Sequence, residues 1–195
     1  MEDQATPANS TLTLVSNDGT KFQLAASAIA SNSSSFLASL LETAEDDGGN
    51  SGDEEIVLDR CGTETLERIV YFLQLCITDP MEAIQDPRDG ALKTTFELNV
   101  PQVVYRKFMT ELPRSVFWKV RSASNYLGIE QLVLLSNVWL AFELKGKSVT
   151  EIHEILGIPM MTEEEENQAR RDHPWIFADP DADDNSNNNP QQEAT

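Results

Sequence analysis

The residues best suited to catalysis or metal binding are few in this sequence, and their spacing completes no known motif. His153 and Glu154 begin like the zinc-protease pattern H-E-x-x-H, but no second histidine follows at the required distance. His173 has no ligand partner nearby in the sequence. We therefore interpret His153 as a residue on the surface of a helix and expect no metal site.

The remaining candidates for covalent chemistry are two cysteines, Cys61 and Cys76. They form no C-x-x-C pair and have no basic cluster beside them, so we interpret them as core thiols. The sequence also has no glycine-rich phosphate loop and no G-x-S-x-G nucleophile elbow. Carboxylates are so abundant that their pairings carry no information, and an acid–base hydrolase has no motif to support it. We expect no enzyme and no cofactor.

The charge of the chain also excludes classes of partner. Its 195 residues include 33 acidic and 14 basic side chains, for a net charge of −19. Such a surface repels phosphate backbones, so we expect no nucleic-acid partner and favour basic ones. The start of the chain has no signal-peptide pattern, and no apolar run is long enough to span a bilayer, so we expect no membrane association.

The first part of the chain predicts a small sheet covered by helices. Residues 11–16 and 21–24 alternate as strands do, and Asn17-Asp18-Gly19-Thr20 joins them as a turn. A third strand is predicted at 55–59. Helical patterns and loops follow in the order 25–30, 35–43, an acidic loop over 42–55, a helix after Gly62, a long loop over 78–100, and helices at 102–110 and 114–127. Residues 1–10 are predicted to be a flexible lead-in.

The stretch 131–147 predicts a helix that is apolar on two sides and that ends at a Lys-Gly-Lys break. One stripe contains Leu132, Leu135, Trp139 and Phe142, and a second contains Leu134, Val138 and Ala141. The helix is too short and too polar to be a membrane span. We therefore expect one side to pack on its own domain and the other to be covered by something else.

Two capping boxes predict further helices after the break at residues 145–147. Ser148 with Glu151 and Thr162 with Glu165 have the required spacing, and Gly157 is expected to end the first of these helices. An apolar cluster at 174–177 follows, and residues 178–195 are predicted to be a disordered acidic tail. Strands and helices mixed early, then helices alone, indicate an α+β fold.

Four segments are distinctive as sequence motifs: KGKSVTEIHEILGI, TEEEENQARRDHPWI, ASNYLGI at 123–129 and, less specifically, TLTLVSNDGTKFQL. Together they resemble one family, the Skp adaptors of SCF ubiquitin ligases. The resemblance covers about residues 11–177 and identifies the chain as a divergent member. It implies a BTB/POZ domain over 11–130 followed by C-terminal helices over 131–177. It also implies no catalysis.

The resemblance further implies that the protein links a cullin to F-box proteins, in the cytoplasm and nucleus. It assigns the cullin side to Asn125 and Tyr126. It assigns the F-box side to Asn137, Leu140, Glu143, Leu144, Leu156, Ile158, Trp175 and Ile176. Trp175 is the favoured anchor, because buried tryptophans dominate many interfaces. Packing in the protein's own core is the alternative for Leu140, Leu144, Leu156, Trp175 and Tyr126. An uncovered apolar face predicts weak homodimers of the free protein.

The sequence also departs from the family pattern at particular positions. Arg121 stands where the family has an apolar residue, so it must extend to solvent or find a partner. Arg106 and Lys107 replace acidic residues on the cullin side. Glu143 replaces a methionine-like residue and predicts a basic or polar group opposite it. These changes leave open an alternative function, a BTB-type scaffold that binds F-box proteins outside a cullin ligase.

Overall fold

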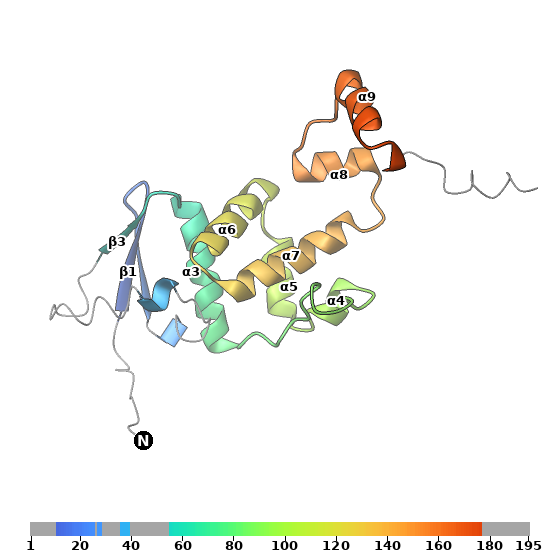
Figure 1. Cartoon of the computed structure of the whole chain (residues 1–195). Coiled ribbons are helices and arrows are strands. Elements are labelled where there is room, and N and C mark those ends of the chain that lie inside the picture. Colours follow the sequence, from blue (N-terminus) through green and yellow to red (C-terminus); the bar gives the residue numbers. More distant parts are fainter. Residues whose placement is uncertain (1–10, 26, 29–35, 40–54, 177–195) are drawn as a thin grey trace, which may run out of the picture. The chain divides into compact units, whose positions relative to one another are not determined.

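The computed structural model describes residues 11–25, 27–28, 36–39 and 55–176, and the chain divides into two compact units (Figure 1). The first unit is Met1–Lys145 and the second is Gly146–Thr195. The predictions for 1–10, for most of the acidic loop 42–55, for Phe177 and for the tail 178–195 lie outside the described residues. No helix in the described part is long and apolar enough to cross a bilayer.

The first unit contains a small mixed sheet with the strand order β2-β1-β3. Strands β1 (Thr11–Ser16) and β2 (Lys21–Ala25) form the predicted antiparallel hairpin, with Leu12 opposite Leu24. Gly19 in the turn has a φ of 83°, a conformation that favours glycine. Strand β3 (Glu55–Leu58) pairs in parallel with β1, with Leu14 opposite Ile56. This sheet and the helical majority confirm the α+β class.

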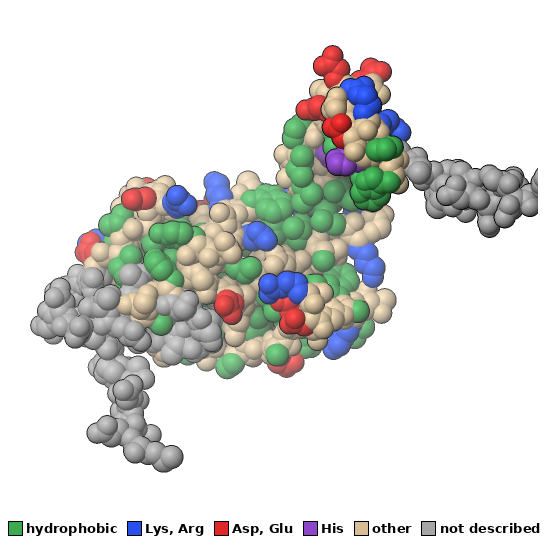
Figure 2. All heavy atoms as spheres, viewed as in Figure 1, with side chains coloured by type: hydrophobic (Ala, Val, Ile, Leu, Met, Phe, Trp, Pro, Cys, Tyr) green, Lys and Arg blue, Asp and Glu red, His purple; other side chains and the backbone are tan. Residues whose placement is uncertain are grey.

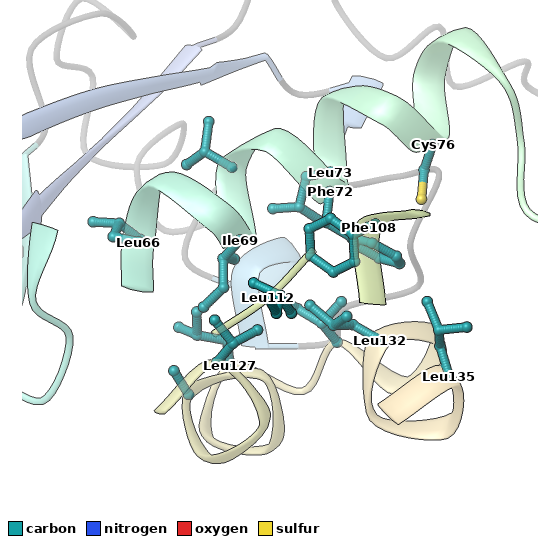
Figure 3. Close-up of a cluster of buried hydrophobic side chains, with 14 of the residues drawn as sticks. Leu66, Ile69, Phe72, Leu73, Cys76, Phe108, Leu112, Leu127, Leu132 and Leu135 are labelled. Atoms are coloured by element: carbon teal, nitrogen blue, oxygen red, sulfur yellow. The ribbon is translucent and has the colours of Figure 1, made fainter. Parts of the chain in front are cut away.

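Five helices follow in the first unit: α3 (Thr63–Thr78), α4 (Phe96–Asn99), α5 (Val103–Thr110), α6 (Arg114–Tyr126) and α7 (Glu130–Leu144). Helix α3 packs against β2 and α6, and α6 packs against α7. Figure 3 shows Ile69 and Phe72 of α3 pointing to the side of the helix on which Leu127 and Leu132 lie. The residues described at 27–28 and 36–39 are helical, within the two early helices that the sequence predicts.

Helix α7 buries most of one of its two apolar stripes, in which only Phe142 is half-buried. Leu132 and Leu135 are 0% exposed, and Trp139 is 8% exposed. In the second stripe Val138 is buried, Leu134 is half-buried and Ala141 is exposed. The helix ends at Leu144, immediately before the predicted break at residues 145–147. One side of α7 therefore belongs to the core, while the side with Leu134 and Ala141 stays open.

The predicted loop 78–100 contains a short helix that the sequence pattern did not indicate, α4. Its last residue, Asn99, is 5% exposed; its amide accepts from Lys93 N at 2.9 Å and donates to the carbonyls of Lys93 and Thr95 at 3.1 and 2.6 Å. Four residues cannot show a helical period, so this local hydrogen bonding decides the structure. The result is an ordered connection rather than an open loop.

A buried tyrosine ties the start of this connection to the core. The Tyr105 hydroxyl donates to the backbone carbonyl of Asp79 and lies 3.4 Å from Cys76 Sγ. Burial raises the pKa of Tyr105, and the hydrogen bond with Cys76 raises it further, so the phenol stays neutral. Beside it, the Gln102 amide donates to Asp79 Oδ1 at 2.7 Å.

The second unit contains α8 (Val149–Leu156), α9 (Glu163–Asp172) and the short 3-10 helix η1 (Pro174–Ile176), which contacts α9. Both predicted capping boxes are present, at Ser148 with Glu151 and at Thr162 with Glu165. Gly157 ends α8 with a φ of 66°, as predicted. None of the residues described in this unit is buried.

Replacing Tyr105 with phenylalanine should destabilise the protein, because the Asp79 carbonyl loses a buried hydrogen-bond donor. We expect the free energy of unfolding in urea to fall by about 1 kcal/mol. Tyr71→Phe is the matched control, since Tyr71 is 52% exposed. Equal stability of the two variants would contradict the role assigned to the Tyr105 hydroxyl.

Candidate protein-docking surfaces

The two cysteines and His153, considered above for catalysis or metal binding, have structural roles in the fold. Cys61 and Cys76 are buried, and burial raises the pKa of the Cys61 thiol, which keeps it protonated and unreactive. His153 is half-buried rather than on the open surface of α8, with Nδ1 lying 3.2 Å from the Ile158 carbonyl and 3.0 Å from that of Pro159. Among the residues that the structure describes, no cluster of metal-ligating side chains occurs.

The second unit presents its apolar side chains to solvent (Figure 2). Trp175 is 74% exposed, Ile176 55% and Ile158 50%. On α8, Val149 is exposed, whereas Ile152 and Leu156 are half-buried. Isolated helices of eight and ten residues, the lengths of α8 and α9, are marginal in water. Apolar side chains exposed together beside such short helices mark a surface that binds another protein.

The connector between α8 and α9 is fixed at both ends. At its start, Ile158 N donates to the His153 carbonyl at 3.0 Å and Gly157 N to the Glu154 carbonyl at 3.3 Å, which is the Schellman arrangement. At its end, the Thr162 capping box begins α9. These two caps define the corner of the chain on which Ile158 lies.

Two methionines on this connector were missed by the sequence analysis. Met160 is 54% exposed and Met161 is 64% exposed. The available signal was their apolar character immediately before the cap residue Thr162, where a solvated loop would carry polar residues. Flexible methionine side chains adapt to different partner surfaces, so both extend the apolar face that Ile158 begins.

In the first unit, the outer side of α7 combines leucines with polar pairs. Leu140 and Leu144 are half-buried. Arg121 Nε and Nη2 donate to Asn137 Oδ1 at 3.1 and 2.8 Å. Arg121 therefore finds the partner that its place in a core-facing helix requires.

The second polar pair lies further along α7, where Arg114 Nη2 contacts Glu143 Oε2 at 3.1 Å. The Arg114 guanidinium also lies 5.7 Å from the centroid of the Trp139 ring. Arg114 was not among the predicted site residues. A basic or polar group of a partner was expected opposite Glu143, but α6 of the same chain supplies a basic one.

Asn125 and Tyr126 occupy the end of α6, which a second Schellman arrangement holds. Ile129 N donates to the Ser124 carbonyl at 2.9 Å, and Gly128 has a φ of 64°. Although adjacent in sequence, the two side chains line different hollows. Tyr126 is 46% exposed beside a hollow of ≈ 820 Å³, with the Arg60 guanidinium 5.8 Å from its ring.

Asn125 lines another hollow, of ≈ 690 Å³, together with Asn137. Its wall also includes Glu130, Val133 and Leu134 of α7, which share one helical face with Asn137. The resemblance assigned Asn125 and Asn137 to different partners, whereas the structure places them on the same hollow. The remaining residues assigned to the F-box side belong to the second unit: Leu156, Ile158, Trp175 and Ile176.

The sequence of this chain is similar to one family model and to several known proteins. The family model "Skp1 family, dimerisation domain" matches residues 131–176. The "E3 ubiquitin ligase complex SCF subunit sconC" of Arthroderma otae is 30% identical over 172 residues, which cover 88% of this chain and 97% of that protein. The same-named protein of Arthroderma benhamiae is 29% identical, over 88% and 98% of the two chains. The "SKP1-like protein 18" of Arabidopsis thaliana is 28% identical, over 66% and 77%.

Removing the cap of α8 should loosen the exposed face of the second unit. In Ser148→Ala, Glu151 N loses its side-chain acceptor, and we expect α8 to lose about 1 kcal/mol of stability. NMR Cα secondary shifts of residues 149–156 measure the helicity. Thr150→Ala is the control, because Thr150 is exposed and makes no cap. A larger loss in Thr150→Ala would contradict the capping role.

The same caps should make the second unit sensitive to acid. Hydrogen bonds from the Ser148 and Thr162 backbone hold the pKa of Glu151 and of Glu165 below the ordinary value of 4.5. A lowered folded pKa stabilises the helices fully above pH 4.5, and this stabilisation is lost as the pH falls through the folded pKa. NMR titration should give carboxyl midpoints below 4.5 for both residues. Midpoints at or above that value would contradict the capping geometry.

Proposed function

The chain belongs to the Skp1 family, and on this premise we propose that it is the adaptor subunit of an SCF ubiquitin ligase. It is not an enzyme. It connects a cullin scaffold to F-box proteins, which bring the substrate. Its contribution is positional, since tethering raises the effective concentration of the substrate near the transferring enzyme.

One observation carries this proposal beyond family membership. The part of the chain that matches the family model includes a unit without a single buried residue among those described, yet with Trp175, Ile176 and Ile158 at least half exposed. A catalytic domain has no need of such a surface. An adaptor needs it, because partner side chains then complete the apolar packing.

We propose the following contacts for the F-box protein. On α7, Leu140 and Leu144 supply apolar contacts between the polar residues Asn137 and Glu143. On the second unit, Leu156, Ile158, Trp175 and Ile176 supply the rest, and Trp175 is the anchor because it is the most exposed large apolar side chain in the described part of the chain. Met160 and Met161 join this set.

For the cullin we propose the end of α6, with Asn125 and Tyr126. Tyr126 offers an exposed aromatic ring beside the cation of Arg60, a combination common at interfaces. The sheet and helices of residues 11–130 are consistent with a BTB/POZ domain, to which we assign this side. We also propose that the protein acts in the cytoplasm and nucleus, and that the free protein self-associates weakly through the exposed apolar residues of the second unit.

The two partner surfaces can be separated by one substitution on each. Trp175→Ala should weaken binding of a purified F-box domain by about 2 kcal/mol or more and leave binding of a cullin N-terminal fragment unchanged. Tyr126→Ala should have the opposite pattern. Isothermal titration calorimetry measures both affinities for each variant.

The same titrations distinguish the alternatives. Equal losses for both partners in either variant would contradict the two-surface assignment. Binding of the F-box domain without any binding of cullin would favour a scaffold outside cullin ligases. If wild-type protein binds neither partner, the proposed function is wrong.

A further inference from the structure

Two arginines of α6, Arg114 and Arg121, contact side chains of α7, and the two partners differ in charge. Arg114 is paired with the carboxylate of Glu143, whereas Arg121 donates both of its hydrogen bonds to the Asn137 amide oxygen. The ion pairs found among the described residues do not include Arg121. An amide orients a guanidinium but does not neutralise it. A positive charge therefore remains between α6 and α7.

This charge lies beside the surface proposed for the F-box protein. Asn137, Leu140 and Leu144 stand three and seven residues apart on α7 and share its outer face. Arg121 is half-buried and reaches this face through its contact with Asn137. A protein segment that covers Leu140 must therefore approach Asn137 and the guanidinium that Asn137 holds.

Covering Arg121 restricts what the approaching segment can carry. An apolar segment would remove water from an unneutralised cation, which is unfavourable, and a lysine or arginine would add repulsion. A carboxylate would instead accept charge-assisted hydrogen bonds from the guanidinium N–H groups that Asn137 leaves free. Helix α6 itself supplies no carboxylate that could neutralise Arg121, since no acidic residue occurs between Glu111 and Glu130.

We propose that Arg121, oriented by Asn137, binds a carboxylate of the F-box protein and thereby selects F-box domains that carry Asp or Glu at this contact. The inference rests on the proposed function and names a specificity within it. It also reverses the expectation drawn from Glu143, because Arg114 already neutralises that residue. Asn137 acts as a positioning residue, and Arg121 makes the contact.

The test uses three substitutions that each make the net charge more negative by one. Arg121→Gln removes the donor. Asn137→Asp keeps the shape of the pair but neutralises Arg121 from within the chain. Lys119→Gln is the matched control, because position 119 lies on the same helix but points nearly opposite to position 121.

The probes are purified F-box domains encoded by the same genome, each compared with versions in which one Asp or Glu is changed to Asn or Gln. For a domain with the facing carboxylate, Arg121→Gln and Asn137→Asp should each weaken binding about tenfold or more, and Lys119→Gln by less than about twofold. Changing the facing carboxylate to an amide should weaken binding to wild type, yet leave binding to Asn137→Asp nearly unchanged. Thermal melting of each variant confirms folding.

Three results would overturn the inference. Arg121→Gln could bind the F-box domain with wild-type affinity, or Lys119→Gln could lose as much affinity as Arg121→Gln. The third is that no replacement of a carboxylate in the F-box domain weakens binding to wild type more than binding to Asn137→Asp. A wild-type protein that binds none of the domains overturns the proposed function and this inference with it. If F-box domains bind wild type and Arg121→Gln equally well, only the inference is overturned.

Discussion

The apolar side chains of the second unit are not buried within the free chain, and the account of this protein depends on that fact. Helices α8 and α9 are short, and their caps stabilise their ends without providing a core. Trp175 at 74% exposed and Met161 at 64% exposed leave large apolar surfaces in water. A partner that covers them gains hydrophobic free energy and stabilises the unit at the same time. Binding and ordering of this unit are thus one process.

The first unit supplies the rigid part of the adaptor. Its core joins α3, α5, α6 and α7 through residues such as Phe72, Phe117 and Leu132, each 0% exposed. Because α7 is fixed by one side, its other side presents Leu140 and Leu144 at constant positions. The Schellman arrangement at Gly128 likewise fixes the end of α6, where Asn125 and Tyr126 lie. Apolar contacts supply affinity on such a surface, whereas the polar pairs Arg121–Asn137 and Arg114–Glu143 restrict which partners fit.

The sequence predicted features that depend on neighbouring residues better than those that depend on distant ones. The hairpin at Asn17–Thr20 and the capping boxes at Ser148 and Thr162 depend on spacings of a few residues, and all were confirmed. Helix α4 was missed because side-chain hydrogen bonds of Asn99, not a periodic pattern, define it. The pairs Arg121–Asn137 and Arg114–Glu143 join positions 16 and 29 residues apart, so they require knowledge of which sides of α6 and α7 meet. The site residues taken from the family resemblance remain predictions.

Amide hydrogen exchange of the full chain, alone and with a bound F-box domain, tests the central claim most directly. Without a core of its own, the second unit should exchange fast in the free protein, while α3 amides exchange near the rate set by global unfolding. Binding should slow exchange in residues 149–172 by orders of magnitude and change that of α3 little. Strong protection of α8 and α9 in the free chain, or no added protection on binding, would contradict the account.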